Sequence, residues 1–228
     1  MNFFKKFTPN ETVFGFIYFL LQLFIIPGLI TVVGMMLPNP LSVTMINFIF
    51  FLVNFLAVVL IFHKYLMGNL RMAMEAPWHV LRHAAIGLVI YMVGNAVMGF
   101  LILIIDPEFA NINDAMILDM VQENYGLMAI GTVLLVPLVE ECFYRGLIFR
   151  NLYDKRPIAA YGISMVIFSL AHVLGYVGME SFRTLVLCFF QYLPAGFALA
   201  WAYRRSGSIF ASVLVHMAVN QTGMLLMR

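Results

Sequence analysis

Seven apolar runs, each long enough to cross a lipid bilayer as a helix, constrain this chain more than any other feature. A transmembrane helix needs about 20 predominantly apolar residues. Only 11% of the 228 residues are charged, whereas a soluble domain carries about 25%. We therefore expect an all-α, polytopic transmembrane helical bundle of about seven spans. It would form a single integral membrane domain over residues 1–228, as a multi-pass protein of the cell membrane. The runs lie at 12–37, 41–62, 84–105, 126–149, 158–178, 184–203 and 208–227.

The basic residues are distributed unevenly between the segments that join these runs. With the N-terminus in the cytoplasm, the inside segments carry ten basic residues and the outside segments only Arg183 and Arg228. Cytoplasmic loops are enriched in Lys and Arg, so we expect an N-in orientation with the C-terminus outside. The ten inside residues are Lys5, Lys6, Lys64, Arg71, Arg82, Arg150, Lys155, Arg156, Arg204 and Arg205.

Three segments around the runs need separate interpretations. The start, at 1–6, resembles the beginning of a signal peptide, but no small-residue cleavage site follows it. We therefore expect a retained first helix. The segment 63–83 either lies along the cytoplasmic interface or forms a plain connecting loop, and the sequence leaves both open. The polar segment 106–125 contains no Lys or Arg, and we expect a solvated outer loop there.

Few strongly polar side chains remain at membrane depth, and six of them are notable. Charged groups there cost about 2.5–3.5 kcal/mol each on insertion scales and therefore usually mark function. At about 1.5 Å of rise per residue, four of the six lie about 12–22 Å from the cytoplasmic helix ends. We expect three helices to bring these four, namely Glu140, His172, His216 and Asn220, into one layer. The six residues are Glu140, Glu141, Arg145, His172, His216 and Asn220.

The spacing of these residues distinguishes the two adjacent glutamates. Glu141 and Arg145 are four residues apart, so they share one helix face and can pair. Glu140 lies about 100° around the helix from Glu141 and is expected to point elsewhere. Pro137, three residues before Glu140, frees a backbone carbonyl and kinks the helix, which opens space for water. We therefore expect the chemistry from Glu140 and structural support from Glu141 and Arg145.

These residue types suit hydrolysis of an amide bond within the membrane. Burial favours the neutral form of a carboxylic acid, so Glu140 would exchange protons near neutral pH and act as general base on water. His172 would hold or share that water, and His216 and Asn220 would donate to the oxyanion. In a zinc variant, Glu140, His172 and His216 would bind Zn²⁺, the one cofactor that these residues suggest. The chain has no His-Glu-x-x-His helix, which disfavours the usual zinc-protease arrangement without separating the two mechanisms.

Other roles compete with each assignment. The Glu141–Arg145 pair would also serve simply to tie helices together, and an isolated Asn220 is typical of a hydrogen bond between helices. A catalytically silent membrane binding or immunity protein is one alternative function. A proton-coupled transporter that uses Glu140 and His172 as a relay is another. No inverted repeat with paired broken helices is visible in the sequence, which disfavours transport.

Three ordered motifs give the chain a family resemblance. They are Glu-Glu-x-x-x-Arg at 140–145, Phe-x-x-x-His at 168–172 and His-x-x-x-Asn at 216–220. In this the chain resembles the CPBP family of intramembrane proteases, which includes the CAAX prenyl endopeptidases and the bacteriocin-processing Abi proteins. The resemblance covers about 137–225, so we expect the motif-bearing catalytic core at 126–227.

The resemblance implies an intramembrane endopeptidase that hydrolyses a peptide bond of a membrane-associated substrate. Family members are described both as metalloproteases and as metal-free glutamate proteases. We expect the lipid bilayer and a peptide or lipidated protein substrate as partners, and no nucleic acid. Whether the substrate is prenylated is not implied. The implied roles are catalysis by Glu140 and His172, an oxyanion hole of His216 and Asn220, and support from Glu141, Arg145 and Phe168.

Overall fold

The computed structural model describes residues 5–227. The regular secondary structure of this part is helical apart from an isolated bridge between Val177 and Glu180, and turns and loops join the helices. The expectations for residues 1–4 and for Arg228 lie outside the described residues. In chain order the elements are α1 Pro9–Phe24, α2 Ile26–Met36, α3 Val43–Ile61, α4 His63–Glu75, α5 Pro77–Ile105, α6 Ile112–Glu123, α7 Tyr125–Ala129, η1 Ile130–Leu135, α8 Val136–Glu141, η2 Cys142–Phe149, α9 Arg150–Tyr153, α10 Pro157–Ala171, η3 Leu174–Tyr176, α11 Phe182–Ser206 and α12 Ile209–Leu226.

Six helical segments of the described chain are long and apolar enough to cross a membrane, and the bent pair α1–α2 brings the number to seven. The all-α multi-pass fold is therefore confirmed. The first expected span, 12–37, is not one straight helix, because α1 and α2 meet at an angle of 49°. Pro27, in the first turn of α2, lacks the N–H that would continue the α1 ladder, and such prolines bend helices.

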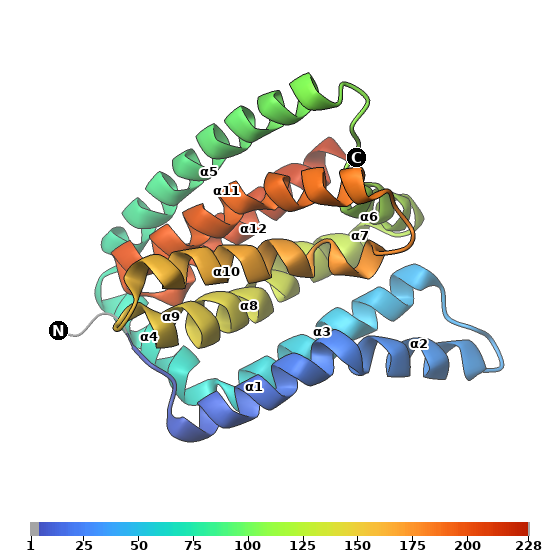
Figure 1. Cartoon of the computed structure of the whole chain (residues 1–228). Helices are drawn as coiled ribbons and strands as arrows, with labels where there is room; N and C mark the ends of the chain where they lie inside the picture. The colour runs from blue at the N-terminus through green and yellow to red at the C-terminus, as the bar shows by residue number, and fades with distance from the viewer. Residues whose placement is uncertain (1–4, 228) are drawn as a thin grey trace.

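The segment Tyr125–Tyr153, which contains the expected span 126–149, lies in the middle of the bundle. It is continuous through α7, η1, α8, η2 and α9. In Figure 1, α8 runs between the layer of α1 and α3 on one side and α10, α11 and α12 on the other. Phe143, Leu147 and Phe149 of this segment are fully buried and form part of the main core. Both layers therefore hold the helix that carries the two glutamates.

The segment 63–83 is helical, so the interpretation as a plain connecting loop is wrong. It forms α4 and the first turns of α5, which begins at Pro77, a favoured residue at a helix start. One face of α4 is buried, and the backbone N–H of Tyr65 donates to Oε1 of Glu11 at 2.8 Å. Trp78, by contrast, is 80% exposed. Its position at the membrane interface stays a prediction.

Ion pairs place the connecting segments at two ends of the bundle. Lys6 and Arg150 both bind the Asp154 carboxylate and hold its pKa below the usual range. Two segments expected on the inside therefore lie at one end. Arg183 pairs with Asp106 at 3.3 Å, which groups two segments expected on the outside. The grouping agrees with the expected topology, while the side that faces the cytoplasm stays a prediction.

The outer segment 106–125 is more ordered than the solvated loop that we expected. It contains α6, whose first turn is capped by the Asn111 side chain, which accepts from the N–H groups of Asn113 and Asp114. At the other end of α6, the Thr44 hydroxyl of α3 donates to the Glu123 carboxylate. The start of α6 is therefore capped by its own chain, and its end is held by α3.

Candidate active site

The two glutamates lie on a short α-helical turn between two π-helical segments. α8 ends at Glu141, η1 precedes it and η2 follows it. In a π-helix, each N–H pairs with the carbonyl five residues earlier, an arrangement that is rare and frequent at functional sites. Pro137 lies in the first turn of α8 and has no N–H, so the helix changes register where the sequence predicted a kink. The backbone hydrogen bonding on both sides of Glu140 therefore departs from that of a regular α-helix.

Glu141 forms the expected pair with Arg145 in the fully buried interior. Nη1 of Arg145 lies 2.9 Å from Oε1 of Glu141, and neither side chain is exposed. Nη2 of Arg145 also donates to the backbone oxygen of Gly196 in α11, at 3.2 Å. The guanidinium lies 4.4 Å from the ring centroid of Phe168, a cation–π distance. The buried guanidinium therefore contacts groups from three helices.

His216 connects the two glutamates, which the sequence had assigned to different faces. Its Nδ1 lies 3.0 Å from Oε1 of Glu141, and its Nε2 lies 3.9 Å from Oε2 of Glu140. The Glu141 carboxylate accepts in its ion pair with Arg145, so we assign the proton to Nδ1. Glu141 therefore orients His216 toward Glu140 in addition to its pairing with Arg145.

His172 approaches Glu140 from another helix in the same manner. It follows Ala171, the last residue of α10, and lies within the candidate span Pro157–Tyr176, in agreement with the expected span 158–178. Its Nδ1 is 2.8 Å from the backbone oxygen of Phe168, which can only accept, and this again assigns the proton to Nδ1. Nε2 of His172 lies 3.9 Å from Oε2 of Glu140.

Three atoms therefore converge, namely one carboxylate oxygen and two imidazole nitrogens. Oε2 of Glu140 is buried and has no hydrogen-bond partner within residues 5–227. A separation of 3.9 Å is too long for a direct hydrogen bond, and such a spacing suits a bridging water molecule. Glu140 keeps 23% of its side chain exposed and His172 keeps 16%. This arrangement can hold a water molecule beside a proton acceptor.

The same three residues were the expected zinc ligands. In the described part of the chain, however, no three His, Cys, Asp or Glu side chains are placed so as to hold a metal ion. The zinc variant stays a prediction.

Phe168 and Asn220 support the site from its edges. The Phe168 ring lies 4.5 Å from the His172 ring and 6.0 Å from the His216 ring, between centroids, so it packs against both imidazoles as well as Arg145. Asn220 is directed to the backbone, because its Nδ2 donates to the carbonyl of Thr132 at 2.8 Å. An amide has two N–H donors, so this bond leaves one for other partners.

Tyr192 is a site residue that the sequence did not indicate. Its ring stacks on His172 with centroids 4.3 Å apart and an interplanar angle of 29°. Its hydroxyl accepts from Nδ2 of Asn113 at 3.1 Å, and Nδ2 of Asn111 donates to Gln191 at 2.7 Å. The start of α6 is thereby tied to α11 beside His172. A tyrosine in an apolar helix gives no sign of this contact in a single sequence.

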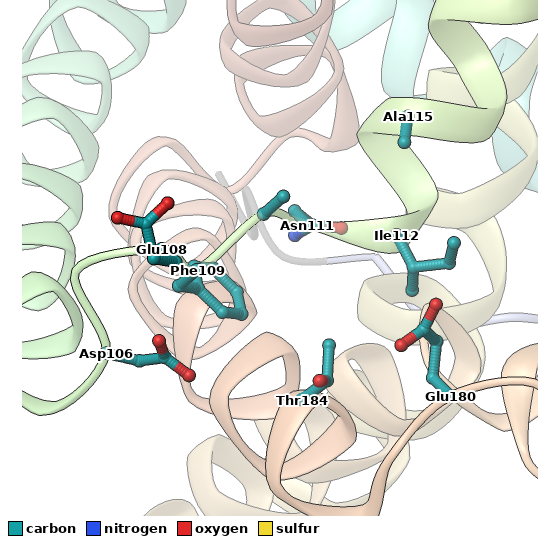
Figure 2. Close-up of a pocket in the computed structure, with 9 residues that line it drawn as sticks. Asp106, Glu108, Phe109, Asn111, Ile112, Ala115, Glu180 and Thr184 are labelled. Carbon is teal, nitrogen blue, oxygen red and sulfur yellow. The ribbon is translucent and has the colours of Figure 1, made fainter.

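A separate hollow lies between the segment 106–115 and the start of α11. Figure 2 shows Asp106, Glu108 and Glu180 around it, and its volume is about 340 Å³. Neither Glu140 nor the two histidines line it. Two of the five acidic residues of the segment 106–125, Asp106 and Glu108, therefore lie here together with Glu180, away from the converging atoms.

Fold and site together define a multi-pass membrane protein with a buried carboxylate–imidazole cluster. Residues 122–222 match the family model described as “Type II CAAX prenyl endopeptidase Rce1-like”. This match includes all three motifs and confirms the resemblance to the CAAX prenyl endopeptidases. The match does not test the similarity to the bacteriocin-processing Abi proteins, which stays a prediction.

Two curated bacterial proteins are similar to part of the chain. One is “Putative membrane peptidase YdiL” of Bacillus subtilis, 32% identical over 109 residues, which are 47% of this chain and 40% of that protein. The other is “UPF0177 protein YxdF” of Lactococcus lactis, 32% identical over 90 residues, which are 40% of this chain and 44% of that protein. The alignments thus span less than half of either relative. No solved structure matches the chain significantly. The family match and the first relative support a membrane protease.

Proposed function

We propose that this chain is an intramembrane endopeptidase whose catalytic core is formed by residues 126–227. The observation that carries the proposal is the convergence of Nε2 of His172 and Nε2 of His216 on the unpartnered Oε2 of Glu140, each at 3.9 Å. A general base must lie within hydrogen-bond reach of the proton that it takes, or one water molecule away. The spacing meets the second condition.

Glu140 and His172 activate the water in this mechanism. Glu140 takes a proton from water while the water oxygen attacks the carbonyl carbon of the substrate. Nε2 of His172, with its lone pair toward Glu140, accepts a hydrogen bond from the same water. The C–N bond then breaks as the proton passes from Glu140 to the leaving nitrogen. One water is consumed, and the products are a carboxylic acid and an amine.

His216 is the principal oxyanion donor, with Asn220 as the second. His216 donates from Nε2 when its imidazole is doubly protonated, and a carboxylate oxygen lies near each of its two nitrogens. Asn220 contributes the amide hydrogen that is not bound to Thr132. Removing one oxyanion donor typically costs about 10²–10³ in rate. The proposed mechanism uses no zinc, so hydrolysis is expected to continue after treatment with a chelator.

The proposed substrate is a membrane-associated peptide or a lipidated protein. A buried site reached among membrane-spanning helices suits a peptide that is itself held at the bilayer. Prenylation of that substrate is the more specific version of the proposal, and it rests on the family description alone.

A comparison of membrane proteomes tests this function and finds the substrate. Cells with the wild-type chain are compared with cells that carry Glu140→Gln at equal abundance. We expect new protein C-termini with the wild-type chain that are absent with the variant. A silent binding protein would instead give identical termini and would keep its cellular phenotype in both Glu140→Gln and His172→Ala. That pair of results would contradict the proposal.

Substitution of Tyr192 tests the alignment of His172. Tyr192→Leu removes the stacked ring and is expected to lower hydrolysis about 2–12-fold, because aromatic pairs contribute about 0.5–1.5 kcal/mol beyond burial. Tyr192→Phe keeps the ring and should lose less. The measurement is kcat for both variants, and equal losses would show that the hydroxyl network matters more than the stack.

A further inference from the structure

The helix that carries Glu140 changes its hydrogen-bond register immediately before the glutamates. Within η1, pairing runs from each N–H to the carbonyl five residues earlier. The backbone N–H of Val136 accordingly donates to the carbonyl of Gly131. The next pair in this register would join the N–H of residue 137 to the carbonyl of Thr132.

Residue 137 is a proline and has no N–H to donate. The carbonyl of Thr132 therefore loses its partner within the helix. Thr132 is buried, and its own hydroxyl is bound to the carbonyl of Met128 at 2.7 Å, so it does not fill the gap. An unsatisfied carbonyl in an apolar interior is costly, and the bilayer offers no water to replace the missing donor.

The missing donor is supplied from another helix. Nδ2 of Asn220 in α12 donates to the carbonyl of Thr132 at 2.8 Å. Asn220 is one helical turn beyond His216, and Pro137 is three residues before Glu140. One hydrogen bond thus joins the helix of the proposed base to the helix of the proposed oxyanion donor, close to both residues.

We propose that Asn220 is a positioning residue whose side-chain amide replaces the backbone N–H that Pro137 lacks. In this way it fixes the backbone ahead of Glu140 relative to His216. This role goes beyond oxyanion donation, and its effect on hydrolysis rests on the proposed function. The positioning role predicts that loss of the Asn220 amide is harmful only when residue 137 is proline, because any other residue at 137 would have its own N–H.

A double-mutant cycle tests this dependence on the full-length protein in detergent. The variants are Asn220→Leu, Pro137→Ala and the two together, with thermal stability and hydrolysis as readouts. Asn220→Leu keeps a similar size without donors and is expected to lower Tm by about 2–6 °C. In the Pro137→Ala background the same change should lower Tm by less than about 1 °C, since the new N–H pairs with the Thr132 carbonyl. Hydrolysis lost in Asn220→Leu should recover at least tenfold in the double variant.

Asn47→Leu is the matched control, because the Asn47 amide donates to Val43 of its own helix, away from the site. Its effect on Tm should be the same with Pro137 and with Ala at that position. Equal Tm losses for Asn220→Leu in both backgrounds would overturn the proposal, as would no loss in either. Lost hydrolysis at unchanged Tm, without recovery in the double variant, would leave Asn220 with the oxyanion role alone and would also overturn the positioning role. If the protein shows no hydrolysis but the Tm loss of Asn220→Leu still depends on Pro137, the positioning role holds and the proposed function fails.

Discussion

Glu140→Gln is expected to lower hydrolysis by about a hundredfold to ten-thousandfold while the protein stays folded. General acid–base catalysis typically contributes this much. The amide has nearly the shape of the carboxylate, but it cannot take the proton of the water held beside His172. Oε2 of Glu140 has no direct partner among the described residues, so the substitution breaks no structural bond of that atom. The measurement is kcat of the purified variant, together with its Tm.

Glu75→Gln serves as the control for this experiment. Glu75 is exposed at the end of α4, so the same change of chemistry there should leave kcat within about twofold. If Glu140→Gln kept wild-type kcat, Glu140 would not be the base. If its Tm fell sharply, the lost activity would report folding, and the assignment would then rest on His172→Ala.

Arg145→Met is expected to cause the largest loss of stability in the molecule, about 3–5 kcal/mol. Breaking a buried ion pair leaves the remaining charge without compensation, and losses of this size are typical. Both side chains are fully buried here, and the guanidinium also loses its contacts with the Gly196 carbonyl and the Phe168 ring. The measurement is the free energy of unfolding in detergent. At this chain length, the loss corresponds to a Tm lower by about 6–20 °C.

The double variant Glu141→Leu with Arg145→Met separates charge from packing. It removes both charges, so it should be more stable than Arg145→Met alone. It should still be less active than wild type, because His216 loses the carboxylate that orients its Nδ1. A double variant less stable than the single one would contradict this account of the pair.

The apolar runs and the i, i+4 spacings predicted the helices and the Glu141–Arg145 pair because both properties are local. The bend at Ile25 and the helical state of 63–75 were not predicted. Hydropathy does not show the bend that a single proline, Pro27, causes. The helix α4 is stabilised by contacts with other segments, such as that between Glu11 and Tyr65. Tyr65, Leu66 and Met72 share one face of α4, but the segment is too polar to stand out among the apolar runs.

The convergence of Glu140, His172 and His216 was predicted from a shared depth in the membrane, and the structure shows it. The link between His216 and Glu141 was not predicted, because a helical wheel places adjacent residues about 100° apart but cannot show what another helix inserts between them. The bond between Asn220 and Thr132 depends on a π-helical register, which no spacing in the sequence indicates.

The origin of the oxygen in the product tests the central claim most directly. The wild-type protein is given, in a single turnover in H₂¹⁸O, a membrane peptide identified by the proteome comparison. Direct attack by water held at Glu140 and His172 predicts one ¹⁸O in the new C-terminal carboxylate and none in the Glu140 side chain. Label in the Glu140 carboxyl would mean that the glutamate attacks the peptide itself, and it would contradict the account.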